Sequence, residues 1–158
     1  MNDFMKIAKE LSDENIQTNV GGPFGACIVQ NGKIIGKGSN HVFKNNDPTA
    51  HAEIVAIRDA CHSINSYDLV ECELYTSCFP CPMCLSAIIW ANIKTVYYGN
   101  TKEDADHIGF KDDFIYQYIQ NLESKIQKQE VLKLKCIDRD ETIKTFEKYI
   151  KKNDKIIY

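Results

Sequence analysis

Two stretches of this sequence indicate its fold and chemistry most strongly. They are Asp47-Pro48-Thr49-Ala50-His51-Ala52-Glu53 and, further along the chain, Cys78-Phe79-Pro80-Cys81-Pro82-Met83-Cys84. The first stretch sets a histidine two residues before a carboxylate, and the second sets two cysteines at C-x-x-C spacing directly after a proline. One imidazole and two thiolates are three ligands that suit zinc and leave its fourth tetrahedral position to water. The sequence therefore predicts a zinc site with His51, Cys81 and Cys84 as ligands.

The spacing of these residues also suggests how they are held. Cys81 and Cys84 are three residues apart, so on a helix both sulfurs face the same way. At the first turn of a helix, free N–H groups and the positive end of the dipole favour thiolate over thiol. His51 and Glu53 would point to nearly opposite sides in mid-helix, so we expect His51 in the first turn. Glu53, not bound to the metal, is then the general acid/base that handles the protons of a zinc-activated water.

The first cysteine of the second stretch leaves an alternative open. If Cys78 joined His51, Cys81 and Cys84, the metal would have four protein ligands and a purely structural role. The other cysteines carry no such spacing and are interpreted as small core residues. They are Cys27, Cys61, Cys72 and Cys136.

Length and composition predict one globular domain spanning residues 1–158, with 44% hydrophobic and 26% charged residues. The sequence contains no run of about 18 apolar residues, so we expect no membrane span. The number of cysteines is odd and no export signal is seen, which favours the cytoplasm. The formal net charge is −3, and acidic residues outnumber basic ones up to Asn121. Nucleic acid is therefore an unlikely partner, because phosphate binding needs a basic surface, and a small substrate is favoured.

Hydrophobic periodicity and turn residues predict an alternation of helices and strands. Asn31-Gly32 is a strong signal for a two-residue hairpin. Thr49 is available as a helix N-cap, and Ile143, Phe146 and Ile150 form the inner side of the last helix. The predicted helices cover residues 3–17, 50–63, 81–91, 112–120 and 139–152, the strands 24–30, 33–39, 71–77, 93–99 and 131–137, and the polar segment 101–109 is a loop.

An opening hairpin followed by strands alternating with helices predicts an α/β fold. We expect a three-layer α/β/α sandwich with a mixed five-stranded sheet. Both metal-ligand stretches then fall at junctions leading into helices, where ligands of α/β folds gather.

The sequence resembles the cytidine deaminase superfamily. H-x-E followed by P-C-x-x-C is the signature of zinc-dependent nucleobase deaminases. The residues 22–26, 46–53 and 75–84 carry the likeness, which is strongest to the bacterial guanine deaminase branch because of Gly109-Phe110-Lys111-Asp112-Asp113-Phe114-Ile115-Tyr116. Two positions depart from the usual pattern: Phe79, where the superfamily often has glutamate, and Lys111, where the branch commonly has an acid.

The resemblance implies hydrolytic deamination of guanine to xanthine and ammonia with one Zn²⁺ per chain. It assigns the metal to His51, Cys81 and Cys84 and the proton shuttle to Glu53. It also implies a homodimer that exchanges C-terminal segments, so that the terminal tyrosine completes a neighbouring pocket. The residues that it places on the purine are Phe24, Asn40, the Ala52 backbone, Asp112 and Tyr158.

Other functions remain open at this point. A related enzyme could act on a nucleoside or on adenosine in transfer RNA. A protein of another class would be a zinc-stabilised binding module without catalysis. Since guanine presents donors at N1 and its exocyclic amino group, a carboxylate such as Asp112 is a suitable group to read it.

Overall fold

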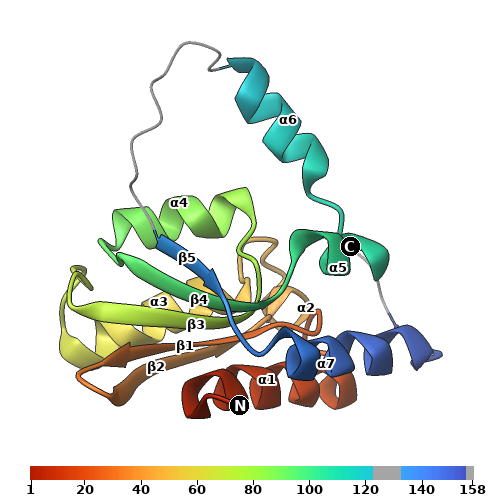
Figure 1. Cartoon of the computed structure of the whole chain (residues 1–158), viewed down its shortest axis with the longest axis horizontal. Coiled ribbons are helices and arrows are strands. Elements are labelled where there is room, and N and C mark those ends of the chain that lie inside the picture. Colours follow the sequence, from red (N-terminus) through yellow and green to blue (C-terminus); the bar gives the residue numbers. More distant parts are fainter. Residues whose placement is uncertain (123–132, 156–158) are drawn as a thin grey trace.

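A mixed five-stranded sheet forms the middle layer of the molecule (Figure 1). The computed structural model describes residues 1–122 and 133–155. The strand order is β2-β1-β3-β4-β5, with β1 antiparallel to both neighbours and β3, β4 and β5 parallel. The expected mixed sheet is confirmed. The strands are β1 (Gly25–Gln30), β2 (Lys33–Ser39), β3 (Cys72–Cys78), β4 (Thr95–Asn100) and β5 (Lys133–Cys136).

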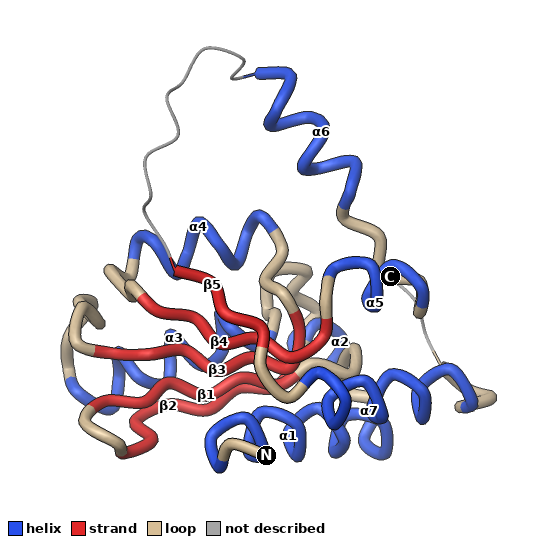
Figure 2. The backbone as a smooth tube through the Cα atoms, in the orientation of Figure 1, coloured by secondary structure: helices blue, strands red, loops and turns tan. Residues whose placement is uncertain are grey.

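Helices cover both faces of this sheet (Figure 2). On one face α1 (Asp3–Thr18) packs on β1 and β3, and α7 (Arg139–Lys151) packs on β4 and α1. On the other face α3 (Ala52–Ile64) packs on β2 and β1 and contacts α4 (Pro82–Trp90). The predicted three-layer sandwich is therefore present. The remaining helices are α2 (Val42–Asn45), α5 (Lys102–His107) and α6 (Asp113–Leu122).

The hairpin between β1 and β2 turns at the predicted residues. Asn31 and Gly32 have φ values of 50° and 72°. Two consecutive positive φ angles are the backbone that a two-residue hairpin with native strand twist requires, and asparagine followed by glycine adopts it at low cost. The turn thus fixes the register of the strand pair at the sheet edge.

A glycine in β2 lets α3 lie directly on the sheet. A Cβ at Gly38 would lie 2.3 Å from the carbonyl oxygen of Ala52 and 2.5 Å from the amide nitrogen of Ala56, closer than atoms can approach. Both alanines are fully buried. Small residues on the two facing elements therefore bring the first turn of α3 close to β2. This close packing sets the positions of His51 and Glu53 at the start of the helix.

The prediction of a loop over residues 101–109 is wrong, because most of it forms α5. The polar composition conceals a capping box: the Thr101 hydroxyl accepts from the backbone N–H of Asp104, whose carboxylate accepts from the backbone N–H of Thr101. These reciprocal bonds satisfy two donors that a helix start leaves unpaired. The short α2 was also missed.

Three further details differ from the expectations. The N-cap of α3 is His51, and the Thr49 hydroxyl donates instead to Asp47, at 2.6 Å. Ile150 is 40% exposed, and Tyr149 takes the inner position because α7 turns its Thr142 and Thr145 side towards the sheet and α1. Cys136 is exposed rather than in the core.

Candidate active site

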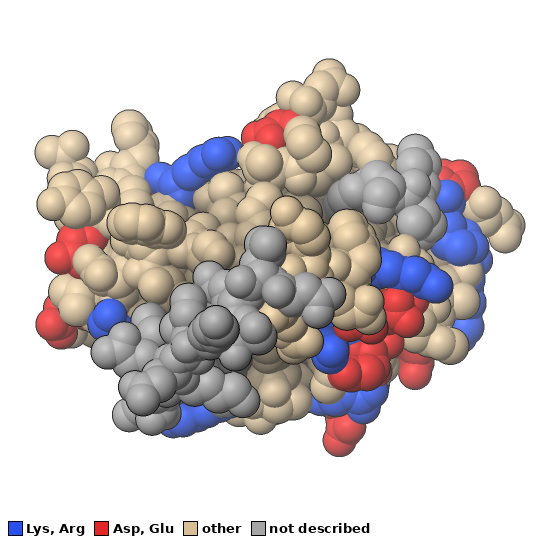
Figure 3. Space-filling view, turned by 90° about the horizontal axis from the view of Figure 1, so that it is seen from above, with Lys and Arg blue, Asp and Glu red and all other residues tan. Residues whose placement is uncertain are grey.

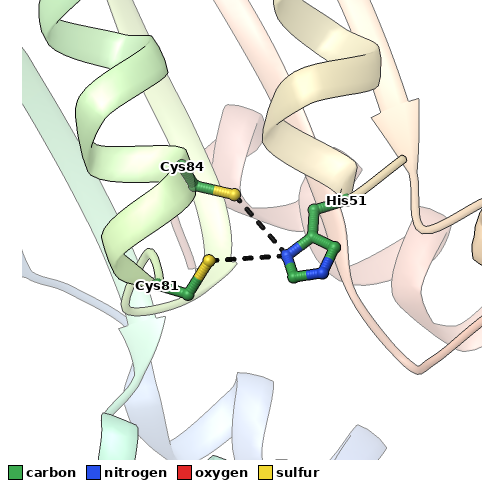
Figure 4. A group of neighbouring side chains, drawn as sticks. All are labelled: His51, Cys81 and Cys84. Carbon is green, nitrogen blue, oxygen red and sulfur yellow. Dashed lines mark hydrogen bonds between the residues drawn. The ribbon is translucent and has the colours of Figure 1, made fainter. Parts of the chain in front are cut away.

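Three potential metal ligands meet between the starts of α3 and α4 (Figure 4). His51 is the N-cap of α3 and Cys81 is the N-cap of α4, with Cys84 one turn further along α4. The Nδ1 atom of His51 lies 3.5 Å from Sγ of Cys81 and 3.6 Å from Sγ of Cys84. The predicted trio is therefore brought together, and within the part of the chain that the structure describes it is the one group of this kind.

These separations fit a tetrahedral zinc ion. Sulfur and nitrogen ligands at about 2.3 and 2.0 Å from one tetrahedral zinc lie roughly 3.6 Å from each other. Both separations from Nδ1 of His51 match that value. Cys78 stands outside this group, and its Sγ donates to the carbonyl oxygen of Thr101 at 3.4 Å. The described geometry thus groups His51, Cys81 and Cys84 as candidate ligands and leaves Cys78 out.

The local sequence explains why these side chains converge. Pro82 occupies the first turn of α4, where its missing N–H costs nothing, and β3 ends just before it at Cys78. The first turns of α3 and α4 both point at the ligand group, so unpaired N–H groups and the positive ends of two helix dipoles favour negative charge there.

The two thiols differ in acidity. The interaction with the neighbouring Cys84 lowers the pKa of the Cys81 thiol to about 4, and the adjacent His51 acts in the same direction. The pKa of Cys84 is raised well above its ordinary value by that same interaction with Cys81 and by burial. A divalent cation bound by both sulfurs would favour the thiolate form of each.

Glu53 lies beside the ligand group and is 6% exposed. One carboxylate oxygen, Oε1, accepts a hydrogen bond from the Thr76 hydroxyl at 3.3 Å. The other, Oε2, accepts from Sγ of Cys84 at 3.4 Å. Burial, followed by the nearby Cys81 thiolate, raises the pKa of Glu53. A buried carboxyl group with a raised pKa beside a metal site is suited to proton transfer.

A cavity of about 440 Å³ opens next to these groups. Its wall is mainly apolar, with a few polar groups, as expected for a small-molecule site. The residues that line it come from the segment before β1, from the starts of α3 and α4, and from the segment between α5 and α6. The lining residues are Phe24, Asn40, Pro48, His51, Glu53, Cys78, Phe79, Cys81, Met83, Ala105, Phe110, Lys111, Asp112, Phe114 and Ile115.

Asn40 is held rigidly at the cavity wall. Its Oδ1 accepts from the backbone N–H groups of Gly22, at 3.3 Å, and Val42, at 3.2 Å. Its backbone oxygen accepts from the side-chain amide of Asn15 at 2.7 Å. The side chain is 2% exposed. With Oδ1 engaged in this way, the Nδ2 group is the part of Asn40 that can donate to a ligand.

The segment between α5 and α6 supplies a second acidic group of the cavity, Asp112. Burial, followed by the Cys81 thiolate, raises the pKa of Asp112. Tyr116, one turn into α6, donates from its hydroxyl to the carbonyl oxygen of Pro80 at 3.2 Å. This bond joins the base of α6 to the turn that carries Cys81, so Asp112 is held near the ligand group.

Most residues expected at the site lie around this one cavity. Phe24, Asn40, His51, Glu53, Cys81 and Asp112 line it, whereas Cys84 and Ala52 are buried behind it. The Ala52 N–H belongs to the first turn of α3, where a helix offers no internal acceptor. Tyr158 lies outside the described residues.

Several residues at the site were not expected from the sequence. Thr76 contacts Glu53 from β3, and Phe110 and Met83 line the cavity. The alternation of β3 placed Thr76 on the same sheet face as Leu74, so strand periodicity could have indicated it. No sequence signal distinguishes Phe110 or Met83 from ordinary core residues.

Residues 1–100 match the family model described as the cytidine and deoxycytidylate deaminase zinc-binding region. The chain belongs to this family of zinc-binding deaminases. Among its relatives is a guanine deaminase of Bacillus subtilis, 53% identical over 116 residues, which are 73% of this chain and 74% of that protein.

A solved structure and a second relative bear on the comparison. The crystal structure of guanine deaminase from Bacillus subtilis superposes with a TM-score of 0.73 at 43% identity, covering 100% of this chain and 99% of that one. A tRNA-specific adenosine deaminase of Buchnera aphidicola subsp. Schizaphis graminum is 40% identical over 138 residues, 84% of this chain and 86% of that protein.

Proposed function

We propose that this chain is a zinc-dependent guanine deaminase that hydrolyses guanine to xanthine and ammonia. The observation that carries the proposal is that a three-ligand group, a buried general acid/base and a second carboxylate, Asp112, which can accept from guanine, all lie at or directly beside one cavity. The identity of 53% to a guanine deaminase supports the same substrate.

We infer that one zinc ion per chain is held by His51, Cys81 and Cys84. When bound there, the ion supplies Lewis acidity and lowers the pKa of water to about 7. Glu53, which is not among the three ligands, would take one proton from the water and pass it to the purine ring nitrogen. It would then carry the water's second proton, from the hydroxyl added to the ring carbon, to the amine, which departs as ammonia. Its burial and raised pKa suit both halves of this transfer.

The purine would lie between apolar and polar walls of the cavity. Asp112 would accept from N1–H and the exocyclic amino group of guanine, while Nδ2 of Asn40 and the N–H of Ala52 would donate to ring and carbonyl acceptors. Phe24 would pack against the ring. Adenine and cytosine lack this pair of donors, so they would leave the Asp112 carboxylate unpaired.

We also propose a single domain, a cytoplasmic location and a homodimer that exchanges C-terminal segments, with Tyr158 completing the partner's pocket. The support is the resemblance of the sequence to the guanine deaminase branch. Among the described residues, no helix is both long and apolar enough to cross a bilayer.

The competing substrate is adenosine in transfer RNA, because a tRNA-specific adenosine deaminase is also a relative. The formal net charge of −3 argues against it. On the one face that Figure 3 shows, lysine, arginine and acidic side chains of the described residues are interspersed. RNA binding depends on a basic surface.

A panel of substrates monitored by ammonia release tests the proposal. Guanine, guanosine, cytidine, adenine and transfer RNA are each supplied to the zinc-loaded wild-type protein, with Glu53→Ala as the control. The expected result is turnover of guanine by the wild type, with loss by orders of magnitude in the variant at unchanged zinc content. Preferential inosine formation in transfer RNA, or full activity of Glu53→Ala, would contradict it.

A further inference from the structure

We propose that Phe146 of α7 is a positioning residue for substrate binding, because it holds the aromatic wall of the cavity in place from behind. The inference rests on the proposed function only for the identity of the substrate. It applies whether α7 belongs to the same chain, as in this structure, or to a second copy.

Phe24 connects the cavity with α7. Its ring meets the Phe110 ring edge-on, with centroids 4.9 Å apart and an interplanar angle of 88°. It meets the Phe146 ring in the same manner, at 5.5 Å and 78°. Phe24 and Phe110 line the cavity, whereas no α7 residue is among the described lining residues. Phe146 therefore acts on the cavity through Phe24.

The rings are tightly confined. Phe146 is 1% exposed and Tyr149, whose ring lies 5.9 Å from that of Phe110, is 4% exposed. A Cβ at Gly22 would lie 2.9 Å from ring atoms of both Phe24 and Phe110. With backbone on one side and α7 on the other, the two cavity rings have little room to rotate. Closely packed interiors transmit such constraints because few voids can absorb them.

A second contact ties α7 to the segment that carries Asp112. The Arg139 guanidinium donates to both carboxylate oxygens of Asp104. Its Nε donates to Oδ2 at 2.7 Å and its Nη2 donates to Oδ1. Asp104 caps α5, and the backbone N–H of Phe110 bonds back to Ala105 of that helix at 3.0 Å. The start of α7 thus anchors α5, from which the chain continues to Asp112.

The ligand group of His51, Cys81 and Cys84 is not held by these contacts with α7. His51 and Cys81 begin α3 and α4 on the opposite face of the sheet, and Glu53 is held by Thr76 and Cys84. Removing the Phe146 ring should therefore weaken purine binding and leave zinc binding and proton transfer intact. If purine binding is weakened while proton transfer is unaffected, KM should rise with little change in kcat.

The test compares Phe146→Leu with Thr142→Val in the zinc-loaded full-length protein. Phe146→Leu keeps an apolar side chain but removes the ring that meets Phe24. Thr142 is equally buried on α7, and its hydroxyl donates to Oδ1 of Asn100 at 3.1 Å, so Thr142→Val disturbs the packing of the same helix without touching the rings. Measured quantities are kcat and KM for guanine, the Kd of the analogue 8-azaguanine, zinc content and Tm.

Phe146→Leu should raise KM and the Kd about five- to tenfold, with kcat within twofold and zinc unchanged. Thr142→Val should lower Tm without changing KM or the Kd. Equal increases of the Kd in both variants, or an unchanged Kd in Phe146→Leu, would overturn the inference. If the wild type binds 8-azaguanine but releases no ammonia from guanine, the proposed function fails, and the Kd comparison still decides the role of Phe146.

Discussion

The Thr76 hydroxyl, on β3, donates to Oε1 of Glu53, on α3, at 3.3 Å, and this bond joins the sheet to the carboxylate beside the metal ligands. Thr76 is 1% exposed and Glu53 is 6% exposed. Because both groups are largely shielded from solvent, the bond limits rotation of the carboxylate. A general acid/base must stay within hydrogen-bond reach of the proton it transfers.

We expect Thr76→Val, which removes the hydroxyl and keeps the shape, to lower kcat about tenfold with little change in KM or zinc content. A hydrogen bond to a charged group contributes roughly 1.5–3 kcal/mol. Thr76→Ser retains the donor and is the matched control, with kcat close to the wild type. Equal losses in the two variants would indicate packing rather than the hydroxyl.

Asp112→Asn should raise KM for guanine by about 10- to 100-fold, since it replaces a charged acceptor with an amide of the same shape. Zinc content should not change, because Asp112 is outside the ligand group. Asp113→Asn is the control, as its side chain is 62% exposed and pairs with Lys102. Steady-state kinetics on guanine measure both. A normal KM in Asp112→Asn would remove this carboxylate from substrate recognition.

Cys78→Ser tests the number of metal ligands. The Cys78 thiol bonds to Thr101 and burial raises its pKa, which disfavours the thiolate that zinc needs. Zinc content, measured by atomic emission, should stay near one per chain in Cys78→Ser and fall sharply in Cys81→Ser. Loss of zinc from Cys78→Ser would instead support the closed, four-ligand site.

The contact between α1 and α7 should make stability depend on pH through Asp13. Burial acts to raise the pKa of this carboxyl, but hydrogen bonds from Lys9, at 2.6 Å, and Thr145 outweigh it and lower the pKa below 3.8. A depressed folded-state pKa contributes stability that is present above the unfolded value, near 3.9, and is lost as pH falls through the folded value.

Asp13→Asn should therefore lower the urea midpoint at pH 7 and have progressively less effect below about pH 3.5. Glu10→Gln, on the same helix but in a pair at 4.0 Å with both side chains more than half exposed, should have little effect at either pH. A destabilisation of Asp13→Asn that is the same at both pH values would exclude the carboxylate charge as its source.

The sequence predicted the parts of the molecule whose signals are local. Asn31-Gly32 identified the first hairpin because few residues tolerate two positive φ angles, and the spacing of His51, Cys81 and Cys84 identified the ligand group because metal coordination permits few arrangements. The residue classes at these positions determine the local geometry almost completely.

The missed features depend on contacts between distant segments. Tyr149, rather than Ile150, faces inward because of how α7 is rotated against α1 and β4, which periodicity alone does not define. The position of Phe110 at the cavity wall likewise follows from α5, whose polar sequence was interpreted as a loop. Tertiary packing decides such details.

Gly38 gives the outer hairpin an influence on chemistry at a site that it does not line. The start of α3 carries His51, and its distance from β2 depends on the missing side chain of Gly38. The position of β2 therefore influences the distances between the His51 imidazole and the sulfurs of Cys81 and Cys84. A larger residue at position 38 would push the start of α3 away from the sheet and shift the imidazole relative to the two sulfurs, without altering a candidate ligand or any residue that lines the cavity.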